Sequence, residues 1–495
     1  MTQLDADCAN RGSNVFRLSA VLAGHLADVR SLSSLVDPHT SSLISDDYSE
    51  SAARHDGSSS GSSYGLLSGS RDGTAASWIH DDDDDDKDGP GGRWRRDQVW
   101  DRGHAGYYVN SVCSFRLGRG RQSYVATAGS DALVQLYRLD SESEPIQTLS
   151  GHEHNVCSVR VDLERDAYWI ATASWDGTAR IWDAAAVVDD ETKEADDVRA
   201  KLVLTTPDEP FAAAVWDVLV MNRNRDENEL VCLTASADNH VRLYKGSNLV
   251  STLKGHLGPV RALSKLFLAS SDGGSENSSS ESDDELLFAS ASNDGTVRIW
   301  NYATGQALAV LDHQDFIYSL AAIPPSATTK TGAGLASSGE DGLVKVWNAI
   351  DGKCDQTIEV PALSVWSVTI LANGDLACGC SDDRIWVFTR SDDRVASTDS
   401  RVWQEYETGL IDYRERRRAK AATTTEGDRT EKEEELTFEI DISDDQPRIR
   451  LAFNPDRDDP HEVSEKFVRE HELPESYIDE IVDFLGAANA RSCRR

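Results

Sequence analysis

The sequence has few positive charges, no CxxC pair of cysteines and no long apolar run. Its 495 residues include 86 Asp and Glu but only 50 Lys and Arg, which gives a formal net charge of −36. A field of that sign repels nucleic acid and anionic membrane surfaces, so we expect neither as a partner. The eight cysteines form no CxxC pair and are expected to be reduced thiols. The sequence shows no membrane-spanning stretch and no signal peptide, so we expect a soluble protein of the cytoplasm and nucleus.

One short motif is abundant and occurs seven times. Each copy, which we call the cassette, has a strand of small residues, an Asp, and an alternating strand that ends in an aromatic residue six positions after the Asp. The cassette Asp residues are Asp72, Asp131, Asp176, Asp238, Asp294, Asp341 and Asp382. Their aromatic partners are Trp78, Tyr137, Trp182, Tyr244, Trp300, Trp347 and Phe388. A fixed spacing repeated seven times indicates a repeat architecture.

The residue pattern of the cassette predicts two strands joined by a tight turn. The Asp carboxylate accepts hydrogen bonds in such a turn, and the Gly or Asn that often follows it tolerates a positive φ. A Gly-His or Asp-His pair precedes five cassettes, at His25, His104, His152, His256 and His313. In the strand that follows, apolar residues three positions apart break the alternation, which predicts a β-bulge.

These features resemble the WD-repeat family. The resemblance implies an all-β fold, a seven-bladed β-propeller with four strands in each blade, over residues 15–389. The segment VFRLSAVL, before the first cassette, is predicted to supply the outer strand of the last blade and so close the ring. The cassette Asp residues and the paired histidines are expected to be structural. Because the histidines fall in separate blades, we predict no metal site, and we predict no cofactor and no catalytic residue.

Polar segments interrupt and follow the repeats. Acidic and Ser-rich stretches at 38–63, 81–92 and 270–285 are predicted to be loop insertions in the propeller. Residues 390–435 are predicted to be a polar linker with a short helix around Trp403–Arg418. Residues 436–489 are predicted to form a small α+β domain, with two alternating strands followed by two helices that begin at Pro460 and Pro474.

Two regions resemble the phospholipase A2-activating protein (PLAA/ubiquitin fusion degradation) family of ubiquitin-homeostasis factors. In the propeller, the string PALSVWSVTILANGDLACGCSDD carries the strongest likeness, because Pro-Ala-x-Ser-Val-Trp replaces the usual Gly-His of the seventh blade. In the tail, FEIDISDDQPRIRLAFN and DDPHEVSEKFVREHELPESYIDEIVDFL resemble part of the family's ubiquitin-binding PFU domain. The family's PUL domain, which docks an AAA ATPase segregase, has no recognisable counterpart here, so we expect that partner only if a PUL domain is supplied separately.

The resemblance implies a non-enzymatic adaptor that binds ubiquitin or ubiquitylated proteins. Its expected roles are proteasome-mediated, ubiquitin-dependent degradation and ubiquitin recycling. The alternative is a generic WD-repeat scaffold, such as a ubiquitin-ligase substrate receptor or an assembly factor, with a partner other than ubiquitin. A third possibility, an enzyme or a direct lipase regulator, is prompted only by the family's name. No nucleophile, base and orienting group come together in the sequence, so we expect no enzymatic activity.

The propeller is expected to bind at its rim, where the cassette turns meet the starts of the inner strands. Two positions in each blade are predicted to lie there: the residue before the cassette Asp, and the residue after the first apolar residue of the inner strand. The predicted ubiquitin-binding residues among them are Arg30, Arg71, Trp175, Trp216, Arg261, Tyr318, Glu340 and Trp366. Large aromatic residues at a rim are typical anchors of protein interfaces, and packing between blades is the alternative for each of them.

In the tail, four residues match the PFU motif most closely. The predicted ubiquitin-binding residues there are Phe453, Asn454, Asp459 and Pro460. For these residues the alternative role is maintenance of a small fold.

Overall fold

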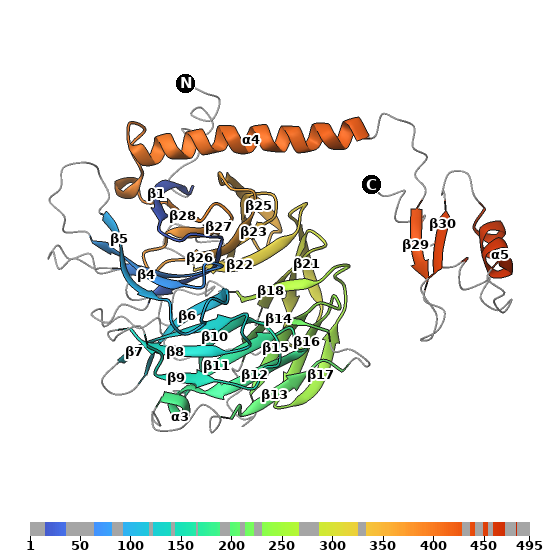
Figure 1. Cartoon of the computed structure of the whole chain (residues 1–495), viewed down its shortest axis with the longest axis horizontal. Coiled ribbons are helices and arrows are strands. Elements are labelled where there is room, and N and C mark those ends of the chain that lie inside the picture. Colours follow the sequence, from blue (N-terminus) through green and yellow to red (C-terminus); the bar gives the residue numbers. More distant parts are fainter. Residues whose placement is uncertain are drawn as a thin grey trace, which may run out of the picture. The chain divides into compact units, whose positions relative to one another are not determined.

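Seven four-stranded antiparallel sheets form the larger part of the described fold (Figure 1). The computed structural model describes residues 15–35, 64–81, 93–117, 122–139, 144–164, 167–188, 199–207, 213–221, 230–266, 287–324, 333–427, 436–440, 449–453, 459–470 and 482. The chain divides into two units, Met1–Tyr413 and Arg414–Arg495, and all seven sheets belong to the first.

Each sheet is one blade, and its strands are named here from the inside of the propeller outward. The inner strands are β2 (Val29–Leu35), β6 (Val109–Leu117), β10 (Val156–Glu164), β14 (Val215–Val220), β18 (Val260–Lys265), β22 (Ile317–Ile323) and β26 (Val365–Ile370). The second strands are β3 (Tyr64–Ser70), β7 (Gln122–Gly129), β11 (Ala167–Ser174), β15 (Val231–Ser236), β19 (Leu287–Ser292), β23 (Gly334–Gly339) and β27 (Leu376–Cys380). The third strands are β4 (Ala75–Asp81), β8 (Val134–Arg138), β12 (Thr178–Asp183), β16 (Val241–Lys245), β20 (Thr296–Asn301), β24 (Leu343–Asn348) and β28 (Arg384–Thr389). The outer strands are β5 (Arg93–Trp100), β9 (Gln147–Leu149), β13 (Leu202–Thr205), β17 (Asn248–Leu253), β21 (Ala307–Asp312), β25 (Lys353–Glu359) and β1 (Arg17–Ala23).

The ring closes with a strand from the beginning of the chain. Strand β1 pairs with β28, so the seventh blade combines the first strand of the chain with the last three of the propeller, blue beside orange in Figure 1. The inner strands contact one another in a complete circle, with β26 next to β2. The predicted closure by VFRLSAVL is therefore confirmed, and β28 gains a partner on its outer side.

The hydrophobic core lies between neighbouring sheets. Phe288 and Trp300 of the fifth blade, for example, pack with Val241 and Leu253 of the fourth, and all four side chains are buried. Each blade therefore depends on its neighbour to cover its apolar face.

The cassette turns adopt the backbone geometry that the sequence predicts. The residue after each cassette Asp has a positive φ in all seven blades: Gly73, Ala132, Gly177, Asn239, Gly295, Gly342 and Asp383. Four are Gly, for which this region carries no steric penalty, and Asn and Asp tolerate it better than most side chains. Ala132 is held there against its intrinsic preference, with a φ of 68°.

Side-chain hydrogen bonds link the inner strands around the ring. The Oγ atom of Ser31 accepts from the backbone N–H of Val112 in the next blade, at 3.1 Å. Equivalent bonds run from Val159 N to Ser111 Oγ, Leu263 N to Asp217 Oδ2, Val368 N to Ser319 Oγ and Leu32 N to Ser367 Oγ, at 2.8–3.2 Å. Between the third and fourth blades, Ser158 instead donates to Asp217. Buried inner-strand polar groups therefore find partners across blade boundaries.

The longest insertions connect strands at the end of the blades away from the cassette turns. The connections at 36–63 and 267–286 join an inner strand to a second strand, and those at 82–92 and 189–198 join a third strand to an outer strand. These four connections contain 23 Asp and Glu but only 3 Lys and Arg. They therefore contribute −20 of the formal net charge of −36. The predicted insertions at 38–63 and 270–285, and 82–92 of the third, lie outside the described residues.

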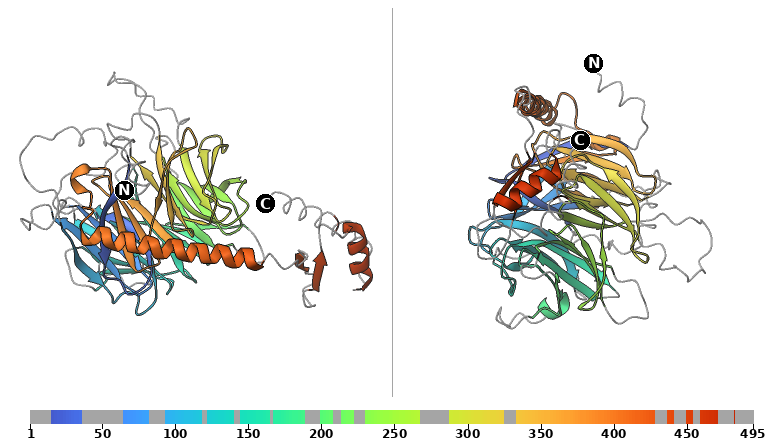
Figure 2. Two further views of the ribbon diagram at one scale, coloured as in Figure 1. Left: turned by 90° about the horizontal axis from the view of Figure 1, so that it is seen from above. Right: turned by 90° about the vertical axis from the view of Figure 1, so that its right-hand side faces the viewer.

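Among the described residues of the first unit and the segment that follows it, three helices accompany the propeller strands. Helix α3 (Ala184–Val188) follows β12, and the short helix η3 (Asp392–Arg394) follows β28. Helix α4 (Arg401–Gly427), orange in Figure 2, extends beyond both ends of the short helix predicted around Trp403–Arg418. Its first half packs on the propeller, where Leu410 and Tyr413 are buried. The segment predicted as a polar linker therefore contains a helix whose beginning is part of the first unit.

The described part of the second unit contains a hairpin and a helix. Strands β29 (Leu436–Ile440) and β30 (Ile449–Phe453) pair antiparallel, and helix α5 (Pro460–Glu470) follows. The two predicted strands and the first predicted helix are confirmed. The helix predicted from Pro474 lies outside the described residues, apart from position 482.

Candidate functional site

Every inner strand carries a β-bulge at its second residue. The pairing with the second strand shifts register after the first residue in all seven blades, as between Val29 and Ser31 or between Val365 and Ser367. The bulged residues are Arg30, Asn110, Cys157, Trp216, Arg261, Tyr318 and Trp366. The predicted bulge is confirmed. Each of these residues lies outside the ladder, where a bulge re-aims a side chain.

The second predicted rim position is fixed by a backbone hydrogen bond that recurs in all seven blades. The N–H of the residue before the cassette Asp donates to the carbonyl two residues before the bulge, as in Glu340 to Phe316, at distances of 2.8–3.1 Å. The donors are Arg71, Ser130, Trp175, Ala237, Asn293, Glu340 and Ser381. The turn and the bulge are thereby held side by side at one end of each blade.

Aromatic side chains at these positions pack across blade boundaries. The rings of Trp175 and Trp216 meet edge to face with their centroids 5.2 Å apart, and Tyr318 stacks on Trp366 at 4.5 Å. The Arg261 guanidinium lies 3.5 Å from the centroid of Trp216 and 5.4 Å from that of Tyr318, so it joins the two pairs. The aromatic residues therefore do pack between blades, and Trp175 is still 41% exposed.

Two more arginines extend this arrangement. The Arg30 guanidinium lies 3.8 Å from the centroid of Trp366, and that of Arg71 lies 5.6 Å from it. Arg71 also forms an ion pair with Asp28 at 3.1 Å. Glu340 accepts hydrogen bonds from Tyr318 Oη at 2.9 Å and Ser364 Oγ at 2.7 Å. All eight predicted rim residues thus form one contiguous set, which we call the rim cluster: Arg30, Arg71, Trp175, Trp216, Arg261, Tyr318, Glu340 and Trp366. Their role in binding stays a prediction.

Burial weakens the protonated state of two rim arginines, Arg30 and Arg261. Burial, and then the charges of Arg71 and Arg261, lower the pKa of Arg30 to about 10. Burial also lowers the pKa of Arg261. Stacking on aromatic faces offsets part of this cost through cation–π attraction. Burial, followed by the hydrogen bond to Glu340, raises the pKa of Tyr318, so its hydroxyl stays protonated as a donor.

Exposed apolar side chains surround the rim cluster, and the repeat pattern of the sequence does not predict them. They lie in the short loops that lead into the inner strands and are 47–89% exposed: Leu26, Tyr107, Tyr108, Leu257, Phe316 and Leu363. Each lies between the paired His, or the Pro-Ala that replaces Gly-His in the seventh blade, and the first residue of the inner strand. An apolar residue in this short, turn-like segment is the sequence feature that indicates such a surface. An apolar surface of this kind at one end of a propeller is typical of a protein-binding face.

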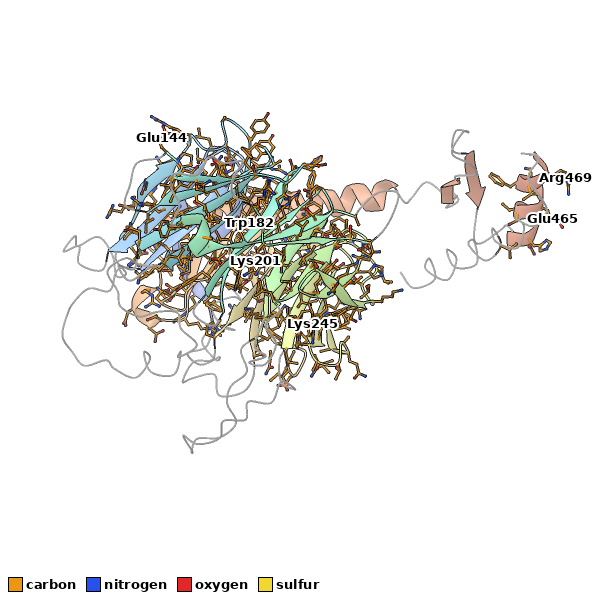
Figure 3. The ribbon with its side chains drawn as sticks, turned by 90° about the horizontal axis from the view of Figure 1, so that it is seen from below. Glu144, Trp182, Lys201, Lys245, Glu465 and Arg469 are labelled. Atoms are coloured by element: carbon orange, nitrogen blue, oxygen red, sulfur yellow. The ribbon has the colours of Figure 1, made fainter. Side chains whose placement is uncertain are left out.

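The cassette Asp residues perform a structural task that varies between blades. In the third blade, His152 Nδ1 lies 2.8 Å from Asp176, its Nε2 lies 2.8 Å from Thr172 Oγ1, and the indole of Trp182 donates to the same Oγ1 (Trp182 is labelled in Figure 3). The blades of Asp72 and Asp294 repeat this network with Ser in place of Thr, and Asp131 pairs with His104.

Three blades depart from that network. In the sixth, His313 Nδ1 bonds Ser337 and Nε2 lies 3.4 Å from Asp341. The fourth and seventh blades lack the paired His, and there Asp238 pairs with Arg242 and Asp382 accepts from the indole of Trp386. Burial raises the pKa of Asp382 more than its hydrogen bonds lower it.

The predicted tail residues fall around the start of helix α5. Asp459 caps the helix, because its Oδ1 accepts from the N–H of His461 at 2.7 Å. Pro460 is the first helical residue, where its missing N–H costs nothing. Phe453 ends β30 and pairs with Leu436, and Asn454 lies outside the described residues. The role of these four residues in binding ubiquitin stays a prediction.

The buried thiols of the described part of the chain are poor nucleophiles. Burial raises the pKa of Cys113 to about 12 and also raises those of Cys157, Cys378 and Cys380 well above the ordinary value. Among the described residues, no three His, Cys, Asp or Glu side chains are placed to hold a metal ion. None of the helices the structure describes is both long and apolar enough to cross a bilayer.

Comparison with known families matches both parts of the chain. The model for PFU (PLAA family ubiquitin binding) matches residues 397–492, a span that begins before the predicted domain start at 436 and includes α4. The model for the WD domain, G-beta repeat, matches residues 143–183, 277–301 and 305–348.

Curated relatives and a solved structure resemble the chain over most of its length. The ubiquitin fusion degradation protein 3 homolog of Caenorhabditis elegans is 26% identical over 85% of this chain and 43% of the relative. The ubiquitin homeostasis protein lub1 of Schizosaccharomyces pombe is 26% identical over 95% of this chain and 60% of the relative. The chain thus spans about half the length of these relatives. The crystal structure of the WD40 beta propeller domain of Doa1 is 27% identical, with a TM-score of 0.53 over 77% of this chain and 99% of that one.

Proposed function

Because this chain belongs to the PLAA family, which joins a WD-repeat propeller to a PFU domain, we propose that it is an adaptor that binds ubiquitin and ubiquitylated proteins. Its relatives are named for ubiquitin fusion degradation and for ubiquitin homeostasis, and the proposal gives this chain a part in both processes. We propose that it acts by binding alone, without catalysis, in the cytoplasm and nucleus.

The rim cluster is the observation that supports a ubiquitin site on the propeller. It combines stacked aromatic residues, arginines and the Glu340 carboxylate, and exposed apolar side chains surround it. Ubiquitin is recognised through an apolar patch with basic neighbours. The exposed Leu257, Phe316 and Leu363 suit the apolar patch, and Glu340 and Asp28 suit the basic neighbours.

Titration of the full chain with labelled monoubiquitin tests this proposal. We expect saturable binding in the micromolar range, which is typical of a small transient interface. The double variant W216A/W366A removes two aromatic anchors, so it should weaken the propeller-dependent part of binding tenfold or more. A matched control is W94A, because Trp94 lies on the outer strand β5, far along the blade from the bulges.

The outcomes separate the possible functions. If W216A/W366A is folded but loses binding, and W94A binds as the wild-type chain does, the rim cluster is supported as a ubiquitin site. If the full chain binds no ubiquitin, the ubiquitin-adaptor proposal is wrong and a WD-repeat scaffold with a different protein partner takes its place.

A further inference from the structure

Two of the rim arginines form no ion pair in the described structure, although the charge of Asp28 raises the pKa of one of them, Arg30, against the larger effect of burial. Arg30 and Arg261 are bulged residues of β2 and β18, both half-buried, and neither belongs to any ion pair among the described residues. Of the carboxylates around them, Asp28 is paired with Arg71, and one oxygen of Glu340 already accepts from Tyr318 and Ser364. In a chain with a net charge of −36, such a local excess of positive charge needs an explanation.

The same place also has an excess of hydrogen-bond donors. Arg30 Nη1 and the indole Nε1 atoms of Trp216 and Trp366 are buried, and within the described structure none of them has an acceptor. An unpaired buried donor is costly, and native structures seldom leave several together. The guanidinium groups of Arg30 and Arg261 lie over indole faces, so their N–H edges remain the part that can receive a ligand.

A ligand that satisfies these groups must carry negative charge and several acceptor atoms. A carboxylate meets both needs, since each oxygen accepts more than one hydrogen bond. The donors are recessed on the inner strands, whereas Phe316, Leu363 and Leu257 are exposed beside them. A narrow chain end can approach such half-buried donors while the folded body of the partner rests on the exposed side chains.

We propose that Arg30 and Arg261 bind the C-terminal carboxylate of free ubiquitin. This inference rests on the proposed function and adds the group that the rim recognises. Ubiquitin ends in two glycines, which have no side chains to hinder approach to stacked indole rings. Conjugation through the C terminus converts the carboxylate into an uncharged amide, so the site distinguishes free ubiquitin from ubiquitin attached to a target.

The test compares ubiquitin with ubiquitin whose C terminus is a primary amide. Both are titrated by calorimetry into the full chain, into the variant R30Q/R261Q and into the control R95Q. Arg95 lies on β5 and pairs with Asp97 in an exposed ion pair, so R95Q removes positive charge away from the rim. Circular dichroism and thermal unfolding check that each variant is folded.

The wild-type chain and R95Q should bind the amide about tenfold or more weakly than ubiquitin, since a charge-assisted contact is lost. R30Q/R261Q should bind the two forms equally. If the wild-type chain binds both forms equally, the chain-end inference is overturned and the proposed function stands. If R30Q/R261Q weakens both forms by the same factor, the arginines contact an acidic side chain instead, which also overturns it. Absence of any ubiquitin binding would reject the proposed function itself.

Discussion

At the scale of single residues, identical positions in different blades have opposite electrostatic properties. Asp176 accepts from Thr178 and from the backbone N–H of Glu153, besides its contact with His152. Burial by itself raises the pKa of this carboxyl group, but these hydrogen bonds lower it well below its ordinary value. Asp382 has no such His, and burial raises its pKa. The fold therefore stabilises the ionised carboxylate of Asp176 and destabilises that of Asp382.

This contrast predicts different effects of the same substitution. Asp176→Asn should lower the free energy of unfolding by about 2 kcal/mol at neutral pH, because charge-assisted hydrogen bonds are lost. Asp382→Asn should change it by less than about 1 kcal/mol, because the amide oxygen can still accept from Trp386 and no buried charge remains. Urea denaturation of both variants beside the wild-type chain measures the two values. Equal losses would show that the neighbouring groups do not set the role of the cassette Asp.

The pH dependence of the Asp176 variant follows from the direction of the pKa shift. The folded-state pKa lies below the unfolded value of about 4, so the stabilisation is complete above that value and is lost as the pH falls toward the folded-state pKa. The difference between the wild-type chain and Asp176→Asn should therefore shrink steadily below about pH 4. A difference that stayed constant down to pH 2 would contradict this assignment.

At the scale of elements, helix α4 contributes to the packing of the propeller although it is not part of any blade. Tyr406 Oη donates to the carbonyl of Glu359 at 2.8 Å, and Tyr413 Oη donates to the carbonyl of Asp341. Val402, Trp403 and Tyr406 pack against the core between the sixth and seventh blades. The helix thus covers the place where the chain closes its ring.

Shortened chains test the contribution of this helix. A fragment that ends at residue 395 should unfold with a free energy at least about 3 kcal/mol lower than one that ends at residue 418, because it leaves the apolar surface under Tyr406 and Leu410 exposed. A fragment that ends at residue 427 serves as the control and should match the one that ends at 418. Equal stability of the fragments ending at 395 and 418 would mean that α4 only rests on the propeller.

The sequence predicts the elements well where local geometry decides them. The cassette turns, the bulges and the closing strand each follow from residue type and spacing, and the structure confirms all three. The packing of α4 could not be predicted in this way, because a helix rich in Arg, Glu and Thr reads as a solvent-exposed linker. The packing role of Tyr406 and Tyr413 becomes visible only in the structure, where they donate to backbone carbonyls of β25 and of the sixth-blade turn.

At the scale of the whole molecule, the most acidic connections and the predicted binding residues are separated. The rim cluster lies at the cassette end of the blades, and the most acidic connections leave from the other end. The sequence predicts the eight residues of the rim cluster, but not that Arg261 bridges Trp216 and Tyr318, because that contact joins three different blades. The distances between blades come from the closed ring and are not encoded in any one repeat.

Two predicted ubiquitin sites in one chain imply avidity. A chain of four ubiquitins should bind the full protein tenfold or more tightly than monoubiquitin, since the second contact forms at a high effective concentration. The W216A/W366A variant should lose most of this gain, because only the PFU site remains. The affinities are measured on a biosensor with surface-bound ubiquitin chains. An equal gain in affinity for the wild-type chain and for W216A/W366A would show that the rim cluster is not one of the two ubiquitin sites.

The bulge at the second residue of every inner strand allows the rim side chains to be changed without a change of fold. Because a bulged side chain does not take part in the ladder, its identity can change without moving the register of the strand. The backbone N–H of the residue before the cassette Asp forms its hydrogen bond in every blade whatever the side chain, so any residue except Pro can keep this bond. A library that randomises both positions in neighbouring blades would therefore sample new binding specificities while the fold stays constant, and this propeller would serve as a scaffold for engineered binders.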